Sequence, residues 1–243
     1  MHETELWITK LFNENLAAIG NTLIGIVGMA PEARPWANFV TMQLVVAAII
    51  ILLFAFLKPR LSADHPGKLQ HTCELVYDFL RDQAHEQVGH GSLQYLPYFG
   101  TLFIFILFSN LIGVIPGMES PTMMPSVPAG CAIATFFYYN IVGVQAIGIV
   151  KYLAHFAGPM PFLAPLMIPI ELVSHLARPL SLTIRLFANM YAGEQVTMVF
   201  LKLTLLLFPA IFMGLHIFVS ILQAYIFMLL TMMYVAGAVA QEH

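Results

Sequence analysis

A single arginine, Arg185, lies in the middle of a long apolar stretch, within the segment that runs from Ser181 to Asn189. An unpaired charge inside a bilayer costs several kcal/mol, so charged residues there usually face other protein, water or a charge of opposite sign. We therefore expect Arg185 to belong to a surface that handles ions.

Polar residues recur beside Arg185 every three or four positions, which is the repeat of an α-helix. At about 100° per residue, one polar face lies within about 40° of Arg185. It comprises Glu171, Ser174, Arg178, Ser181, Arg185 and Asn189, whereas Glu194 turns to the opposite face. A second polar face, on the following helix, comprises His216, Ser220, Gln223, Thr231 and Tyr234. Two polar faces on apolar helices predict contact with water or ions.

The two polar faces predict a helical hairpin with a turn near residue 205. Such a turn places Glu194 and His216 each about 11 residues away from it. Arg185 and Gln223 are each about 18 to 20 residues away from it. The members of each pair are therefore expected to lie at similar depth.

The outgoing helix of this hairpin is too long to cross a membrane upright. About 38 residues at 1.5 Å each give roughly 57 Å, nearly twice the approximately 30 Å of the hydrocarbon layer. Pro169 and Pro179 could kink the helix, but a strong tilt is the simpler accommodation.

The composition indicates an integral membrane protein, because 59% of the 243 residues are hydrophobic and only 9% are charged. Soluble domains carry about 25% charged residues. We predict an all-α fold with about five membrane-embedded helices, an amphipathic cytoplasmic-surface helix and a strongly tilted C-terminal hairpin. The expected parts are an outer N-terminal segment (1–35), a first span (36–57), a cytoplasmic loop (58–97), two further spans (98–150) and the hairpin (161–243).

The distribution of basic residues predicts the orientation, since Lys and Arg are enriched in cytoplasmic loops. It places the loop 58–97 inside, and both the N-terminus and the hairpin turn outside. The basic residues that support this are Lys58, Arg60, Lys68, Arg81 and Lys151, whereas Lys10, Arg34 and Lys202 fall on the outer side.

Within the cytoplasmic loop, helical spacing predicts an amphipathic helix. Its apolar face comprises Leu69, Thr72, Val76, Phe79 and Gln83, with Leu75 and Leu80 beside it and Glu74, Asp78, Arg81 and Asp82 opposite. Helices on membrane surfaces are usually richer in Lys and Arg. Docking to a protein partner and lying on the bilayer therefore both stay open.

Several functions are disfavoured. The net charge of −3 and the lack of a glycine-rich phosphate loop argue against nucleic-acid and nucleotide partners. A disulfide between Cys73 and Cys131 is implausible, since the two are expected on opposite sides. The scattered histidines show no close ligand spacing, so we expect neither a metal site nor a cofactor.

Four runs of sequence closely resemble one known family, subunit a of the F-type ATP synthases. They are Asn110–Gly117, Ile170–Ser174, Arg178–Glu194 and Leu222–Met228. In that family, subunit a is a non-catalytic stator that holds two offset aqueous half-channels against a rotating ring of c subunits. Each c subunit bears a membrane-embedded carboxylate.

The resemblance implies a role for each polar residue. Arg185 would be the essential arginine that faces the ring and separates the half-channels. Asn189, Glu194, His216 and Gln223 would belong to the outer half-channel, and Glu171 and Ser174 to the cytoplasmic exit. The implied partners are the c-ring, the peripheral stalk subunit b, the remainder of the ATP synthase and the lipid bilayer, in a bacterial inner membrane.

The chain departs from some relatives in one respect that matters for the path. Those relatives carry extra acids around the second span, where this chain has Gly113, so a proton role for that span is not expected here. In some relatives the acid and the imidazole exchange places across the hairpin. Glu194 and His216 are therefore expected to titrate as a unit.

Structural roles compete with these assignments. Glu171 and Arg178 could be interfacial anchors, Ser174 and Ser181 could serve close helix packing, and Asn189 and Gln223 could hydrogen-bond between helices. His155 and His175 are expected to be structural. At the level of function, the alternatives are a secondary transporter that binds an anionic substrate at Arg185, and a membrane anchor without ion traffic. The choice between H⁺ and Na⁺ is left open.

Overall fold

The computed structural model describes residues 5–26, 30–62, 67–89, 91–115, 117–149, 152, 164–203 and 207–239. Within these residues the chain forms helices and turns and no strand, so the predicted all-α fold is confirmed. The expected turn near residue 205, Lys151 and His155 lie outside the described residues.

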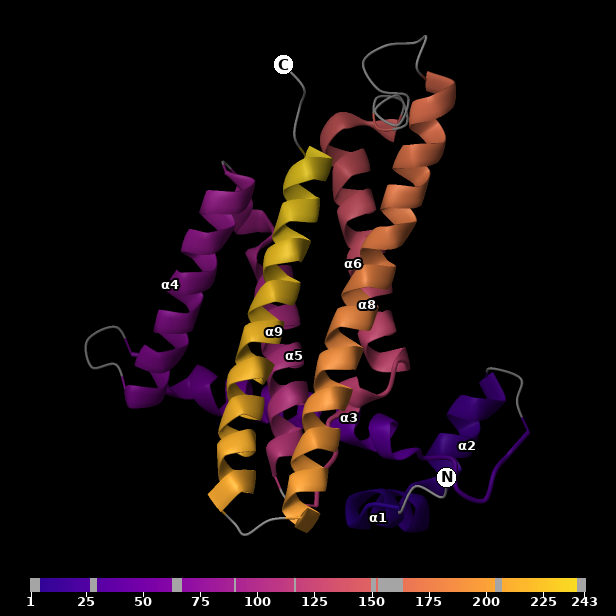
Figure 1. Ribbon diagram of the computed structural model, residues 1–243. Helices are drawn as coiled ribbons and strands as arrows, with labels where there is room; N and C mark the ends of the chain where they lie inside the picture. Colours follow the sequence, from indigo (N-terminus) through magenta and orange to yellow (C-terminus); the bar gives the residue numbers. More distant parts are fainter. Residues whose placement is uncertain are drawn as a thin grey trace.

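The helices follow one another in the order shown in Figure 1. They are α1 (Trp7–Asn15), α2 (Ala17–Ile26), α3 (Asn38–Leu57), α4 (Lys68–Val88), α5 (Leu96–Leu111), α6 (Ser126–Ile147), α8 (Ala164–Leu203) and α9 (Leu207–Val239). Short 3₁₀ turns lie between them: η1 (Lys58–Arg60), η2 (Ser92–Gln94), η3 (Ile112–Val114) and η4 (Pro121–Met123).

Glycines end two of the long helices. Gly89 follows α4 with a φ of 80°, and Gly148 follows α6 with a φ of 82°. Side chains with a Cβ rarely adopt such positive φ values, so these positions stop the helices without strain. The helices therefore end where the sequence permits a sharp change of direction.

Four helices within the described residues are long and apolar enough to cross a membrane. They comprise Asn38–Arg60, Leu96–Val114, Ser126–Ile147 and Ala210–Val239. Helix α8 packs against α6 and α9 but is less apolar, because it carries charged residues along its length. Its 40 residues make it about 60 Å long at 1.5 Å per residue.

Helices α8 and α9 run side by side over most of their length, with α5 and α6 packed behind them and α4 beside α9 (Figure 1). Helix α3 instead crosses the bundle near the end where α8 leads into α9 (Figure 1). If α3 spans along the membrane normal, the hairpin must be strongly tilted. A tilt of that kind fits a helix of about 60 Å into a layer of about 30 Å.

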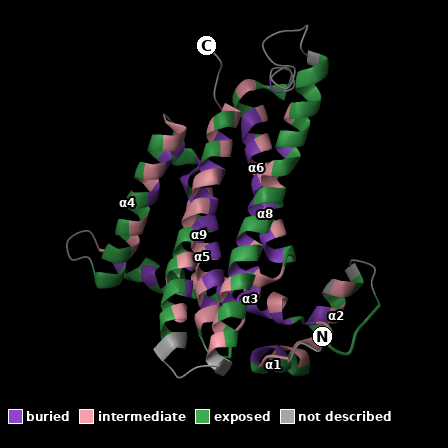
Figure 2. Cartoon of the chain, viewed as in Figure 1, coloured by how far each residue is buried: buried purple, intermediate pink, exposed green. Residues whose placement is uncertain are grey.

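The core lies where α5, α6, α8 and α9 meet. Its largest fully buried side chains include Phe99, Ile106, Tyr139, Leu182, Leu186, Met190, Met228 and Met232. Figure 2 shows that the outward flank of α8 is largely exposed, in contrast to these inner faces.

Three contacts fix the register of α8 against α9. The Ser220 hydroxyl lies 3.9 Å from the sulfur of Met190. The rings of Phe200 and Phe212 stack at 4.2 Å between centroids. A Cβ built on Gly193 would lie 2.8 Å from Nδ1 of His216. These contacts agree with the equal depth expected for Glu194 and His216.

Helix α4 turns inward a face that matches only part of the one that the apolar spacing predicts, since Val76 and Gln83 contact the bundle. Its buried residues are Gln70, Leu80 and Ala84, and the helix packs against α5 and α9. Leu69 and Phe79 of the predicted face stay 44% and 45% exposed. The Tyr225 hydroxyl of α9 donates a hydrogen bond to Oε1 of Gln83 at 2.8 Å. Contact with the hairpin therefore sets the rotation of α4.

The N-terminal segment contains two helices, α1 and α2, that the sequence analysis does not anticipate. α1 packs on α2 and on α3. Its apolar residues, Trp7, Ile8, Leu11 and Phe12, repeat every three or four positions, which is the signal that predicts such a helix.

The register of the hairpin predicts one cross-link. In a chain with Cys73 and Cys131 replaced by serine, Met190→Cys with Ser220→Cys should cross-link efficiently through a short bifunctional reagent. The control, Met190→Cys with Phe227→Cys, places the second thiol about two turns further along α9 and should not cross-link. Gel mobility after treatment measures both, and the reverse result would contradict the register.

Candidate functional site

Arg185 lies on an exposed part of the surface of α8. Its residue is exposed, as is its neighbour Ile184 at 54%. Ser181 and Asn189, about one turn away on either side, are exposed as well. In the part of the chain that the structure describes, no carboxylate forms an ion pair with Arg185. The arginine is thus presented on an apolar outer surface.

Three other residues predicted from the sequence lie on the opposite side of the hairpin, buried inside the chain. Glu194, His216 and Gln223 are 9%, 7% and 8% exposed. Glu194 comes from α8, whereas His216 and Gln223 come from α9. The structure therefore divides the predicted residues into an exposed group around Arg185 and a buried group between the helices.

A cavity of about 340 Å³ joins two of the buried residues. It lies between α8, α9 and the turn that follows α5. Its lining includes Glu194, His216, Thr197, Gly113 and Met118. Glu194 and His216 form no ion pair with each other in the described part of the chain, although they share this cavity. A cavity of this size with polar groups on its wall can hold several water molecules.

Gly193 allows His216 to occupy this position. The ideal Cβ of any other residue at 193 would lie 2.8 Å from Nδ1 and 3.3 Å from Cε1 of the imidazole. The ring therefore packs directly against the backbone of α8, one residue before Glu194. Close packing against a glycine brings the carboxyl and imidazole groups to one wall of the hairpin.

A buried hydrogen-bond network, which no sequence pattern predicts, lies next to the cavity. Asn110 accepts from the Thr122 hydroxyl at 2.7 Å and donates to the carbonyl of Ser220 at 3.3 Å. The Ser120 hydroxyl lies 2.7 Å from that of Thr122 and donates to the carbonyl of Ser109 at 2.8 Å. All five residues are at most 2% exposed. These buried hydrogen bonds hold η4 against the end of α5 and the end of α5 against α9.

The glycine at 113 permits this network. A Cβ at Gly113 would lie 2.8 Å from the Cβ of Ser120 and 3.1 Å from its backbone nitrogen. The turn before η4 can therefore approach the end of α5 closely. The absence of a side chain at Gly113 is therefore required for this close packing.

A second polar cluster lies near the other end of α8. Nδ1 of His175 is 3.5 Å and Nη2 of Arg178 is 3.8 Å from Oε1 of Glu171. The Arg178 guanidinium also lies over the rings of Tyr139 at 5.9 Å and Tyr234 at 5.3 Å. Glu171 and Arg178 are thus half-buried partners, whereas Ser174 is exposed.

Neither a metal site nor a disulfide is built by the residues that the structure describes. No group of three or more His, Cys, Asp or Glu side chains gathers among them, and Cys73 and Cys131 are both free thiols. Glu171, Arg178, Glu194 and His216 lie on α8 and α9, which pack against helices that are long and apolar enough to span a bilayer. Ionisable groups at that depth are typical of proteins that move ions across membranes.

The fold and this site define a multi-pass helical membrane protein that carries ionisable side chains on a long hairpin. Comparison with known proteins narrows this class. The family model described as ATP synthase A chain matches residues 40–236, so the chain belongs to the ATP synthase A chain family.

Close relatives agree with this assignment. ATP synthase subunit a of Solibacter usitatus is 80% identical over 233 residues, which cover 96% of this chain and 100% of that protein. ATP synthase subunit a of Koribacter versatilis is 46% identical over 241 residues, which cover 98% of each chain. The chain is therefore a bacterial multi-pass membrane protein of the ATP synthase membrane sector, with a role in ion transport and ATP synthesis.

The contact between Gly193 and His216 predicts the effect of a single methyl group. Gly193→Ala should displace the imidazole and destabilise the hairpin by about 1–3 kcal/mol, the usual range for overpacking. Gly214→Ala is the matched control, because nothing lies within 4 Å of a Cβ at that position of α9. The unfolding temperature of the detergent-solubilised complex should fall only for Gly193→Ala. Equal behaviour of the two variants would contradict the close packing.

Proposed function

We propose that this subunit is the stator that conducts protons through two offset half-channels to and from the carboxylates of a rotating c-ring. Arg185 separates the two half-channels. The subunit itself makes and breaks no covalent bond other than those to the moving proton. It works beside the peripheral stalk subunit b and the remainder of the ATP synthase.

One observation carries the proposal: Arg185 is exposed on an apolar surface and has no carboxylate partner among the described residues. A bare guanidinium facing lipid costs about 3 kcal/mol or more. A membrane-embedded carboxylate on a neighbouring chain removes this cost. The c-ring supplies such carboxylates one after another as it turns.

The chemistry of arginine suits this position. Its guanidinium stays protonated under all physiological conditions. A fixed positive charge favours the ionised form of a passing carboxylate and therefore promotes proton release from it. The same charge repels a proton that would otherwise pass straight from one half-channel to the other.

The buried group on the other side of α8 supports an outer half-channel. Glu194 and His216 line a cavity large enough for water. Gln223 lies about two turns further along α9, nearer the depth of Arg185. Asn189, exposed one turn from Arg185, would meet the path where it reaches the ring. The polar residues thus lead from the cavity toward the arginine.

The cytoplasmic exit is proposed at the opposite end of α8. Glu171 is 34% exposed there and is tied to Arg178, while Ser174 lies on the same exposed side as Arg185. The carboxylate would take protons from the ring surface to the cytoplasm. A free-standing transporter that binds an anion at Arg185 has no support, because the chain belongs to the ATP synthase A chain family.

The first test removes the charge. Arg185→Ala should abolish ATP synthesis and ATP-driven proton pumping in membrane vesicles while leaving assembly intact. Arg185→Lys should fail or nearly fail, since lysine loses its proton on burial and lacks the planar fork. Arg178→Ala, on the same helix, is the control and should retain part of the activity. Near-normal synthesis by Arg185→Ala would exclude the proposed role.

The second test asks whether Glu194 and His216 act as one relay. Glu194→Gln and His216→Leu should each slow proton flux strongly, and the double variant should be little worse than the poorer single variant. The exchange Glu194→His with His216→Glu should recover part of the flux. Flux is measured in inverted vesicles under an imposed gradient. Fully additive losses without recovery would show that the two residues act separately.

A further inference from the structure

Glu119 is a second carboxylate close to the outer cavity. It lies in the turn between η3 and η4, directly after Met118, which lines the cavity. Its charge acts on the carboxyl group of Glu194, and the backbone N–H of Ser120 also faces that group. Glu119 therefore lies beside the cavity wall, between Met118, which lines the cavity, and Ser120, which packs against Gly113 of the same wall.

Asn38, the first residue of α3, holds Glu119 from the other side. Its Nδ2 donates to Oε2 of Glu119 at 3.4 Å, and its Oδ1 accepts from the backbone N–H of Leu6 at 3.2 Å. Asn38 is only 6% exposed. A buried amide that uses both of its ends in this way fixes the side chain to which it donates.

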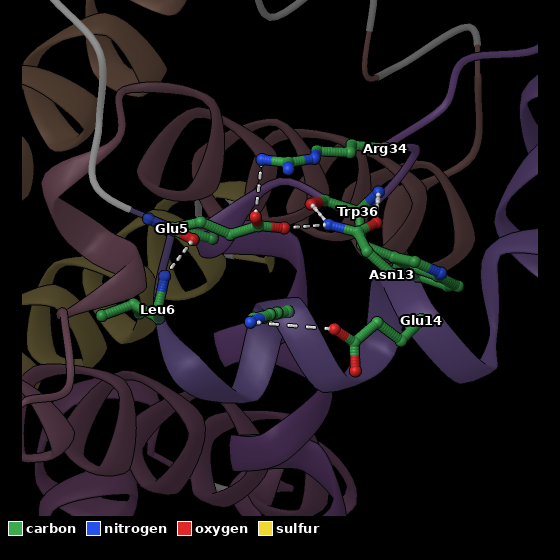
Figure 3. Close-up of polar contacts among 8 residues, drawn as sticks. Glu5, Leu6, Asn13, Glu14, Arg34 and Trp36 are labelled. Atoms are coloured by element: carbon green, nitrogen blue, oxygen red, sulfur yellow. Dashed lines mark hydrogen bonds and ion pairs between the residues drawn. The ribbon is translucent and has the colours of Figure 1, made fainter.

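The segment that presents Leu6 is itself anchored. Asn13 donates to Oε1 of Glu5 at 2.6 Å and to the carbonyl of Trp36 at 3.1 Å, and it accepts from the Trp36 N–H at 3.0 Å. Arg34 pairs with Oε2 of Glu5 at 2.8 Å. Figure 3 shows these side chains converging on Glu5 and Asn13. Helix α1 is therefore bound to the chain that enters α3.

Among the described helices that pack on η4, α8 alone contributes an acidic or basic side chain to the cavity wall. Helices α3, α5 and α6, which pack on η4, contain no Asp, Glu, Lys or Arg. α8 contributes Glu194, and α9 contributes His216 to the same cavity. Oε2 of Glu194 is buried and has no hydrogen-bond partner among the described residues, so it needs a proton or a water molecule.

We propose that Glu119 is a further proton-carrying residue of the outer half-channel, which collects protons at the mouth and passes them to Glu194. Asn38, held by α1, is the positioning residue for this carboxylate. The step moves one proton from the carboxyl group of Glu119, through cavity water, to the carboxylate of Glu194. This inference rests on the proposed proton path and adds Glu119 as the first residue of that path on the outer side.

The test uses the complete ATP synthase in liposomes, with synthesis driven from the outer side at a constant gradient and a varied outer pH. Glu119→Gln should slow synthesis at neutral outer pH by roughly 10-fold. The loss is smaller than the about 100-fold of an enclosed proton-transfer group, because cavity water gives a partial route. The defect should shrink at acidic outer pH, where bulk protons reach Glu194 directly.

Two further variants separate proton transfer from folding. Asn38→Asp keeps the acceptor for the Leu6 N–H but removes the donor to Glu119, and should give a smaller defect with the same pH dependence. Glu119→Asp should restore part of the rate. Glu14→Gln removes an exposed acid of α1 that pairs only with Lys10 among the described residues, and should behave as wild type.

The outcomes distinguish this inference from the proposed function. If Arg185→Ala abolishes synthesis while Glu119→Gln and Asn38→Asp match wild type at every outer pH, only the role of Glu119 is overturned. A loss that does not vary with outer pH would also overturn it, since a structural defect acts at every pH. Near-normal synthesis by Arg185→Ala would instead overturn the proposed function.

Discussion

The cost of holding a charge at membrane depth governs the structure of the hairpin. Arg185 and Glu194 are nine positions apart on one helix, and the structure places them on opposite sides of it. Glu194 is buried against α9, beside a cavity that can hold water, whereas Arg185 faces outward. The two charges are thus kept apart by the body of α8, and each needs a different partner. A charge pair inside the chain would have satisfied both and left nothing to attract a carboxylate from outside.

Close packing between helices provides the room for this arrangement. Gly193 lets the His216 ring lie against the backbone of α8, and Gly113 lets the turn at Ser120 approach the end of α5. The same turn carries Glu119 toward Glu194. Small residues at membrane helix contacts are usually explained by packing alone. Here each glycine also decides where an ionisable group lies.

Much of the hairpin could be predicted from sequence, because the spacings that predict it relate residues that are close together along the chain. The three-to-four spacing around Arg185 indicates one exposed face, and equal distances from the turn give the register of Glu194 against His216. The apolar spacing of α4 predicts its inward face only in part: Val76 and Gln83 contact the bundle, whereas Leu69 stays 44% exposed. Packing against α5 and α9 also decides how α4 is rotated. Asn38 and Glu119 could not be assigned at all. They are 81 positions apart, and no periodicity relates residues on different elements.

The two ends of α8 place their carboxyl groups in different surroundings. Near the turn of the hairpin, carboxyl and imidazole groups surround a cavity, and at the other end Glu171 is held by Arg178, which in turn lies over two tyrosine rings. A carboxylate beside a fixed arginine favours the ionised state. Glu171 has a basic partner within the chain, whereas Glu194 shares a cavity with His216 and forms no ion pair among the described residues. One helix therefore holds two carboxyl groups in different ways, because the residues that surround them come from different elements.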